Sequence, residues 1–331
     1  MRRHCDEACA EYRKGGYRSG DDRARGTGTK AHRADGAASN KCVNPQVDRK
    51  RMASVNVREI AYCHRRLKCA IFSRWQEIGI LRRFEMARQN IYDDEVFFSG
   101  YKKIRDNQVN ANNLFEIPAL FSMMPELKGK RVLDLGCGFG EHCKKIVDYG
   151  AEKVVGIDIS QKMLEVARTE NFDSKIRYIH MPMEEIAQLQ ETFDVVVSSL
   201  AFHYVEDFRG VIRDVYNLLD KKGELIFSQE NPLCTCHSGG NRWTKDENGN
   251  KVHLNLAYYS VEGERESEWF IENVKKYHRT FSTIVNTLIE EGFTIERMIE
   301  PLPTDELLEK YPHYKDLLHK PDFLLIKAKK S

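Results

Sequence analysis

The segment RVLDLGCGFGEHC, at positions 131–143, limits the fold more than any other part of this sequence. Its apolar run ends in an acid, and three glycines then follow at every second position. Such a run is typical of a buried strand that turns sharply into a helix. Glycine allows positive φ angles and lets the backbone approach a ligand closely. The segment therefore predicts a strand that ends at a nucleotide-like ligand.

The spacing of the glycines narrows the choice of ligand. Gly136, Gly138 and Gly140 follow Asp134 in the pattern D-x-G-x-G-x-G, whereas the dinucleotide fingerprint is G-x-G-x-x-G. A phosphate-binding loop needs Lys followed by Ser or Thr after its glycines, and this segment has no such pair. Asp134 would repel a pyrophosphate but can accept hydrogen bonds from a cationic amino-acid group. These features favour S-adenosylmethionine over a dinucleotide or a triphosphate.

Strands and helices alternate from residue 86 onward, which predicts an α/β domain over 86–331. Near-continuous Val, Ile and Leu runs between amphipathic helices indicate a doubly wound parallel sheet covered on both faces. Residues 231–275 break this rhythm, and we expect them to form a lid insertion over the active-site edge. The expected strands are 131–136, 153–160, 176–181, 193–200, 223–230, 293–301 and 323–330, and the expected helices are 140–149, 161–170, 208–220 and 280–292.

A second acid supports a nucleoside ligand. Asp158 ends the second expected strand, 24 residues after Asp134. A carboxylate at this place can accept hydrogen bonds from both hydroxyls of a ribose. Because ligands of such sheets lie outside the carboxyl ends of the strands, we expect both acids at the ligand.

The segment VLDLGCGFG, with VVGIDIS after it, closely resembles the class I S-adenosylmethionine-dependent methyltransferases. The resemblance runs from about Tyr92 to the C-terminus. It implies a Rossmann-like sheet of seven strands, mostly parallel with the last strand antiparallel, and S-adenosyl-L-methionine as cofactor. Four further segments are similar to a bacterial subgroup of these enzymes: FFSGYKKIRDN, SSLAFHYVED, VEGERESEW and YHRTFSTIVNTLIEEGF.

The same resemblance implies roles for single residues. The glycine loop, with Cys137 inside it, would hold the methionine portion of the cofactor, Asp158 the ribose and Ile159 the adenine. Where the family often has Gly-Asp-Ala, this chain has HMPMEE. We therefore expect the Met183 backbone N–H to reach adenine, with Glu184 as the candidate for the side-chain contact.

Three more residues complete the expected cofactor site. Ser199 and Leu200 would lie at the edge of the cofactor, just after the fourth strand. Tyr101 would lie on an N-terminal helix that closes over it.

The candidates for proton removal are His203, Glu230 and His278. The first two lie near the ends of the fourth and fifth expected strands, and His278 precedes the helix at 280–292. A sulfonium methyl is already a strong electrophile, so alignment for in-line displacement by an O, N or C nucleophile should matter more than a base. A structural hydrogen bond is the alternative role for each residue.

The sequence favours a small-molecule methyl acceptor over nucleic acid. Enzymes that methylate DNA amino groups resemble one another in an Asn/Asp-Pro-Pro-aromatic motif, and SSLA stands in its place here. Residues 86–331 hold 32 basic and 40 acidic side chains, against the basic groove that a phosphate backbone needs. Two alternatives stay open, an RNA methyltransferase and a non-catalytic S-adenosylmethionine-binding protein. We expect four aromatic residues to line the lid: Trp243, Tyr258, Tyr259 and Trp269.

Residues 1–85 differ in composition from the rest of the chain. They carry 20 basic and 10 acidic side chains, and Arg outnumbers Lys by 15 to 5. We expect a basic, disordered extension. An alternative hypothesis is that this segment is not native coding sequence and that translation starts at Met86, shortly after Arg82 and Arg83, whose codons could form a ribosome-binding site. The nucleotide sequence decides between the two.

The nine cysteines are irregularly spaced and follow no secretory segment, which predicts free thiols and a cytoplasmic location. No run of about 18 apolar residues occurs, so we expect no membrane span. Cys234, Cys236 and His237 lack a second pair of ligands, so we expect no metal site. The sequence carries no signal for an oligomeric state.

Overall fold

The protein is described by a computed structural model, which covers residues 90–107 and 109–331. The extension expected at residues 1–85 lies outside the described residues.

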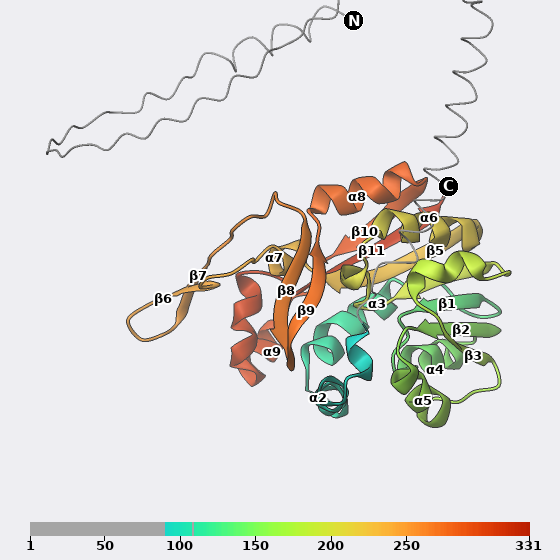
Figure 1. Cartoon of the computed structure of the whole chain (residues 1–331), viewed down its shortest axis with the longest axis horizontal. Helices are drawn as coiled ribbons and strands as arrows, with labels where there is room; N and C mark the ends of the chain where they lie inside the picture. The colour runs from blue at the N-terminus through green and yellow to red at the C-terminus, as the bar shows by residue number, and fades with distance from the viewer. Residues whose placement is uncertain (1–89, 108) are drawn as a thin grey trace, which may run out of the picture. The chain divides into compact units, whose positions relative to one another are not determined.

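A seven-stranded sheet forms the centre of the described chain (Figure 1). Its strand order is β10–β11–β5–β4–β1–β2–β3. The pairs from β3 to β5 are parallel, while β11 is antiparallel to both β5 and β10. The expected fold, mostly parallel with the last strand antiparallel, is therefore confirmed. The strands are β1 (Arg131–Leu135), β2 (Lys153–Asp158), β3 (Ile176–His180), β4 (Phe193–Ser198), β5 (Leu219–Glu230), β10 (Phe293–Ile299) and β11 (Phe323–Lys330).

Helices cover both faces of this sheet because its apolar side chains alternate in direction along each strand. From β1, Leu133 and Leu135 pack in one core with α6 and α8, and Val132 packs in the other with α3, α4 and α5. The bounds of these helices are Ile117–Ser122 for α3, Glu141–Asp148 for α4, Gln161–Glu170 for α5, Phe208–Leu218 for α6 and Phe281–Glu290 for α8. Short 3-10 turns follow β3 and β4, η4 (Met183–Gln188) and η5 (Phe202–Tyr204).

Of the elements that precede β1, η2 lies beside the end of β2. These elements are η2 (Ile91–Asp93), α2 (Glu95–Asp106) and the π-helical turn η3 (Asn112–Glu116). Asp93 Oδ1 accepts hydrogen bonds from Ser160 Oγ at 2.6 Å and Lys162 N at 3.2 Å. These bonds hold η2 at the start of α5.

Two hairpins follow β5 in the inserted segment (Figure 1). The hairpin of β6 (Trp243–Lys245) and β7 (Lys251–Leu254) extends away from the sheet. The hairpin of β8 (Gly263–Trp269) and β9 (Ile271–His278) reaches α2. A Cβ atom on Gly100 of α2 would lie 2.7 Å from the Phe270 ring, so the hairpin tip rests on a glycine. The short helix α7 (Pro232–Thr235) precedes these hairpins, and α9 (Asp305–Lys310) and η6 (Pro312–Leu318) lie between β10 and β11.

Most boundaries lie within two residues of the expected ones. The larger differences are at the insertion: β5 begins at Leu219, four residues before the expected start, and the inserted hairpins continue to His278. Helix α8 ends at Glu290 because Gly292 takes a φ of +99°, which favours helix termination. In residues 90–107 and 109–331, every helix is too short or too polar to cross a bilayer.

Candidate functional site

The glycine loop joins β1 to α4. Gly136, Gly138 and Gly140 have φ angles of 73°, 53° and 79°, a region that side chains other than glycine seldom adopt. The backbone N–H groups of Gly136 and Cys137 both donate to Ile157 O at 2.9 Å. These bonds fix the loop against the end of β2.

Gly140 and Gly138 face different surroundings. A Cβ atom on Gly140 would lie 2.3 Å from Tyr178 Oη and 3.0 Å from Ala167 Cβ, so this glycine permits close packing inside the protein. A Cβ atom on Gly138 would meet no heavy atom within 4 Å. Gly138 therefore presents open backbone on which a ligand can lie.

We expect Gly140→Ala and Gly138→Ala to separate these two roles. Gly140→Ala should cost roughly 2–4 kcal/mol of folding stability, because the left-handed backbone and the Tyr178 clash both act against it. That cost corresponds to a melting temperature lower by roughly 5–15 °C in differential scanning calorimetry. Gly138→Ala should lose only the backbone part, about 1–2 kcal/mol. Equal losses of stability would contradict the assignment.

Asp134 lies within β1, under the glycine loop. Its side chain is 1% exposed, and Oδ2 accepts a hydrogen bond from Cys143 Sγ at 3.2 Å. Oδ1 has no partner among the residues that the structure describes. Burial raises the pKa of Asp134 to about 7. Gly156 on β2 makes room for this arrangement, because a Cβ atom there would lie 2.8 Å from Cys143 Sγ.

Asp158 ends β2 beside the glycine loop. Its Oδ2 accepts from Gly138 N and its Oδ1 from Ser160 N, each at 2.8 Å. Burial is the main reason that the pKa of Asp158 is raised, to about 6. Each carboxylate oxygen can accept more than one hydrogen bond, so both can still bind a hydroxyl group. The structure thus brings the second acid to the loop, as the spacing in the sequence predicts.

The residues expected around adenine lie next to Asp158. Ile159 is half-buried, and its carbonyl accepts from Asn90 Nδ2 at 3.1 Å and lies 2.8 Å from His180 Nε2. Met183 begins η4, and its Cε would lie 3.5 Å from a Cβ atom on Gly136. Met183 is therefore close to the glycine loop, and Glu184 follows it as a half-buried side chain.

The ends of β4 and β5 meet at a buried glutamate that the sequence analysis missed. Glu116 on η3 is fully buried, and its Oε1 accepts from Ser199 Oγ at 2.9 Å and from Ser228 Oγ at 2.5 Å. Leu200 takes a φ of 51°, and its N–H donates to Ser228 O at 3.0 Å. A lone acid in the apolar run LFEIPALF was the available signal for Glu116.

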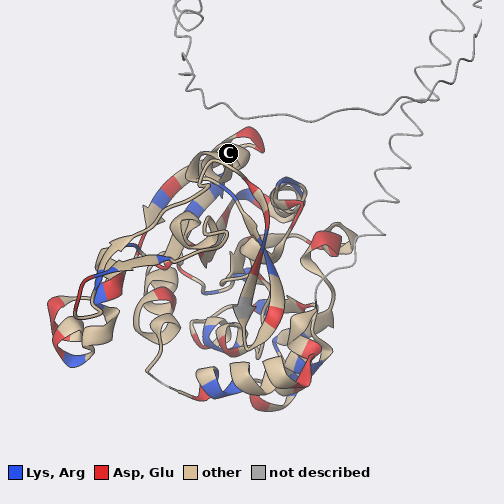
Figure 2. Ribbon diagram, turned by 60° about the vertical axis from the view of Figure 1, so that its left-hand side comes forward, with Lys and Arg blue, Asp and Glu red and all other residues tan. Residues whose placement is uncertain are grey.

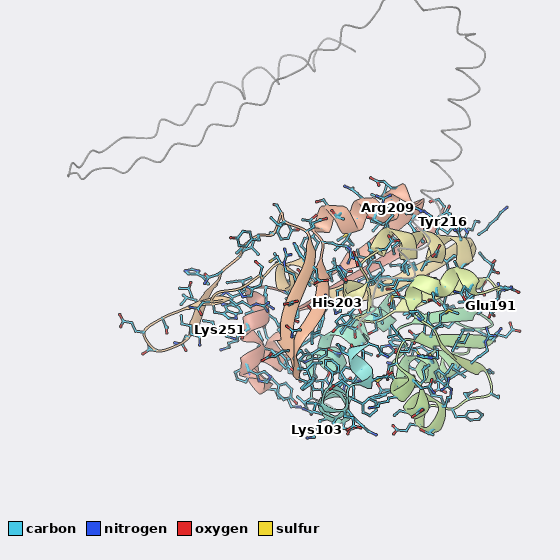
Figure 3. All side chains as sticks on the ribbon, in the orientation of Figure 1. Lys103, Glu191, His203, Arg209, Tyr216 and Lys251 are labelled. Atoms are coloured by element: carbon cyan, nitrogen blue, oxygen red, sulfur yellow. The ribbon has the colours of Figure 1, made fainter. Side chains whose placement is uncertain are left out.

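His203, which Figure 3 labels, lies beside Glu230 at the same edge. Glu230 N donates to His203 Nδ1 at 3.3 Å, and His203 Nε2 lies 3.9 Å from Glu230 Oε1. Burial lowers the pKa of His203 to about 4. Burial alone would raise the pKa of Glu230, but His203 and Lys276 outweigh it and hold that pKa below its usual value. Lys276 of β9, which the sequence analysis also missed, lies 2.5 Å from Glu230 Oε1.

His278 lies at the base of the β8–β9 hairpin with both ring nitrogens engaged. Nδ1 lies 2.8 Å from Thr235 Oγ1, and Nε2 lies 2.8 Å from Tyr259 O. Because a carbonyl only accepts, Nε2 carries the proton, and Nδ1 accepts from the threonine. These contacts connect the hairpin to α7 and suit a structural role better than proton removal.

Aromatic rings connect α2 to the β8–β9 hairpin. Tyr101 lies 5.8 Å from the Phe139 ring of the glycine loop and 6.0 Å from Trp269, and Phe97 lies 5.2 Å from Trp269. Tyr92 joins Phe97, Tyr101 and Tyr204 at 5.0, 5.4 and 6.3 Å between ring centroids. Tyr101 thus lies on the N-terminal helix α2, beside the glycine loop, and its closure over the cofactor stays a prediction.

Of the four aromatic residues expected to line the lid, Trp269 alone joins this group. Trp243 packs on His319 at 5.4 Å, and Tyr258 is 67% exposed. Tyr259 Oη instead accepts a hydrogen bond from Phe281 N at 3.0 Å. The insertion thus reaches α2 through one hairpin only.

The cysteines of the described chain are unbridged. Burial raises the pKa of the Cys137 thiol to about 11, which suits a packing residue rather than a nucleophile. Cys234 lies 3.2 Å from Lys320 Nζ. Over residues 90–107 and 109–331, no group of three or more His, Cys, Asp or Glu side chains could hold a metal ion.

Comparison with known proteins identifies a matching domain family and several similar proteins. Residues 133–227 match the methyltransferase domain family. An uncharacterized protein of Haemophilus influenzae is 42% identical over 247 residues, which are 73% of this chain and 97% of that protein.

Two solved structures are similar over nearly their whole length. A Mesorhizobium loti S-adenosylmethionine-dependent methyltransferase is 38% identical with a TM-score of 0.61, covering 67% of this chain and 99% of that one. A Listeria monocytogenes protein described as an S-adenosylmethionine-dependent methyltransferase is 40% identical with a TM-score of 0.60, covering 65% and 96%. The family match contains the glycine loop, Asp158 and the end of β4.

Proposed function

The chain belongs to the class I S-adenosylmethionine-dependent methyltransferases, and from that premise we propose that it methylates a small-molecule O, N or C nucleophile. The observation that carries the proposal is the contact between the tip of the β8–β9 hairpin and α2, where Trp269 and Phe270 pack on Phe97 at 5.2 and 5.6 Å. A hairpin that packs on α2 in this way suits a small acceptor that is enclosed with the cofactor and shielded from water.

The residues around the glycine loop fit the proposed cofactor. The open backbone at Gly138 suits the methionine portion, and Asp158 suits the ribose hydroxyls. Ile159 and Met183 would contact the adenine, with Glu184 as a further candidate. When bound, the cofactor supplies an electrophilic methyl group on its sulfonium. The protein's task is then to align the acceptor and exclude water.

His203 and Glu230 are the proposed polar groups at the acceptor. His203 is neutral near pH 7 because its pKa is about 4. Its Nδ1 accepts from Glu230 N, so Nε2 carries the proton and can donate to the acceptor, while the Glu230 carboxylate can accept from the acceptor's O–H or N–H group. Lys276 holds Glu230 through the 2.5 Å contact and lies 5.7 Å from the Trp269 ring centroid. This network orients the acceptor and takes its proton.

The charge distribution supports a small acceptor over RNA. Figure 2 colours basic and acidic residues separately, and the two are intermingled over the described elements. Residues 86–331 carry more acidic than basic side chains, 40 against 32. A polyanion would meet repulsion as often as attraction on such a surface.

The proposal is tested by incubating the full chain with a methyl-labelled donor and separate cellular fractions of metabolites, RNA and protein. We expect label in the metabolite fraction, and none with a His203→Asn, Glu230→Gln double variant. Label in the RNA fraction alone would favour the RNA alternative and refute the small-molecule acceptor.

Cofactor binding should depend on pH through Asp158. Because its pKa is raised to about 6, this carboxyl gains a proton as the pH falls through 6 and loses its charge-assisted hydrogen bonds. We expect affinity for S-adenosylhomocysteine, measured calorimetrically, to be level at pH 7–8 and to fall by up to about 10-fold per pH unit below 6. An Asp158→Asn variant should lack this step, and an identical pH profile in the variant would contradict the assignment.

A further inference from the structure

Glu116 is a buried carboxylate to which the cofactor assignment above gives no role. It is 0% exposed and lies at the end of the π-helical turn η3. Single π-helical turns occur often at functional sites. The position of Glu116 in such a turn is therefore a reason to look for a ligand that it contacts.

The two carboxylate oxygens of Glu116 are in different environments. Oε1 accepts two serine hydroxyl groups, from Ser199 at 2.9 Å and from Ser228 at 2.5 Å. Oε2 is buried and has no hydrogen-bond partner in the described part of the chain. Burial raises the pKa of Glu116, although the two serines and Arg105 oppose this shift. A buried, ionised oxygen that accepts no hydrogen bond lowers the stability of the fold. A cationic ligand bound to this oxygen would offset that cost.

The position of Glu116 identifies which part of the cofactor it can meet. Ser199 directly follows β4, and the glycine loop directly follows β1, so both lie at the switch point between these neighbouring strands. Ser198 Oγ donates to Leu135 O at 2.9 Å and ties the two strand ends together. The ribose acid, Asp158, lies on the other side of the loop at the end of β2. Glu116 is therefore on the side of the methionine portion.

Asp134 is the rival for a cationic group, since its Oδ1 also lacks a described partner. However, Asp134 lies inside β1, paired in register with Gly156 and bonded to the Cys143 thiol. Ligands of such sheets lie outside the carboxyl ends of the strands. The serine contact places Glu116 at that end, beyond the strand itself.

We propose that Oε2 of Glu116 binds the α-ammonium group of the methionine portion of the cofactor. The proposal rests on the cofactor assignment made under the proposed function. Ser199 and Ser228 keep the carboxylate in position through Oε1. The ammonium donates to Oε2, so a charge pair forms only when the cofactor is bound.

The test compares S-adenosylhomocysteine with the same compound lacking its α-amino group, by calorimetry on the full chain. The wild type should bind the aminated ligand at least about 10-fold more tightly, since a buried charge-assisted hydrogen bond is lost with the amino group. In Glu116→Gln, which keeps the shape of the side chain, this preference should fall to less than about threefold. Asp134→Asn should retain most of the preference.

Three outcomes would overturn the proposal. The first is a wild type that does not distinguish the two ligands, a result that needs no variant. The second is an undiminished preference in Glu116→Gln, or in Glu116→Asp if the first variant does not fold. The third is loss of the preference in Asp134→Asn alone, which would assign the ammonium to Asp134. If the wild type binds neither ligand, the cofactor assignment itself fails, and the two failures are thus distinguishable.

Discussion

Replacing Asp158 with asparagine is expected to weaken the binding of S-adenosylhomocysteine by about 100-fold or more. The carboxylate would accept both ribose hydroxyls, and each charge-assisted hydrogen bond contributes about 1.5–3 kcal/mol. Asparagine keeps one oxygen and replaces the other with an N–H₂ donor, which would face the backbone N–H of either Gly138 or Ser160, whose hydrogen bonds the two aspartate oxygens accept. Calorimetric titration of the full chain measures the change.

A matched control separates the local effect from a general loss of charge. Asp173, in the turn before β3, pairs with Lys144 at 3.4 Å, and both side chains are partly exposed. Asp173→Asn should leave the affinity within about twofold, because exposed ion pairs contribute little. Undiminished binding in Asp158→Asn, with the wild type binding normally, would remove this residue from the cofactor site.

The glycine loop and Asp158 could be predicted because their signal is local. The spacing of Gly136, Gly138 and Gly140 fixes a strand–turn–helix geometry, and Asp158 ends the next strand of the same parallel pair. Parallel neighbours bring their carboxyl ends to one edge, so two short segments are enough to define this half of the site.

The other half of the site depends on contacts between distant segments. Glu116 meets Ser228 across 112 positions, and Lys276 meets Glu230 across 46. Composition favoured Trp243 and Tyr258 as lid residues, yet only the β8–β9 hairpin packs on α2. Which of two hairpins folds inward depends on tertiary packing, such as Phe270 against Gly100, and the local pattern of neither hairpin encodes that choice.

The step most dependent on this distant packing is the alignment of the methyl acceptor by His203. Asparagine is the informative replacement, because its Oδ1 can still accept the Glu230 N–H bond that His203 Nδ1 accepts at 3.3 Å, while the group at Nε2 is lost. We expect kcat to fall by about 100-fold with the acceptor identified from the labelled fractions, because the Nε2–H donor that aligns the acceptor is lost and a misplacement of about 1 Å can cost about 100-fold.

The pH dependence of kcat tests the protonation state of His203. A lowered pKa means that His203 is neutral throughout pH 6–8, with its one proton on Nε2, so the wild-type kcat should show no step near the ordinary histidine value of about 6.5. His253→Asn, at an exposed position on β7, is the matched control and should leave kcat within about twofold. A His203→Asn variant as active as this control would show that His203 does not align the acceptor, and a wild-type step near 6.5 would show that neutral His203 is not the working form. Glu230 is the proposed base, because its carboxylate is ionised over the same pH range and Lys276 holds it at the edge of β5.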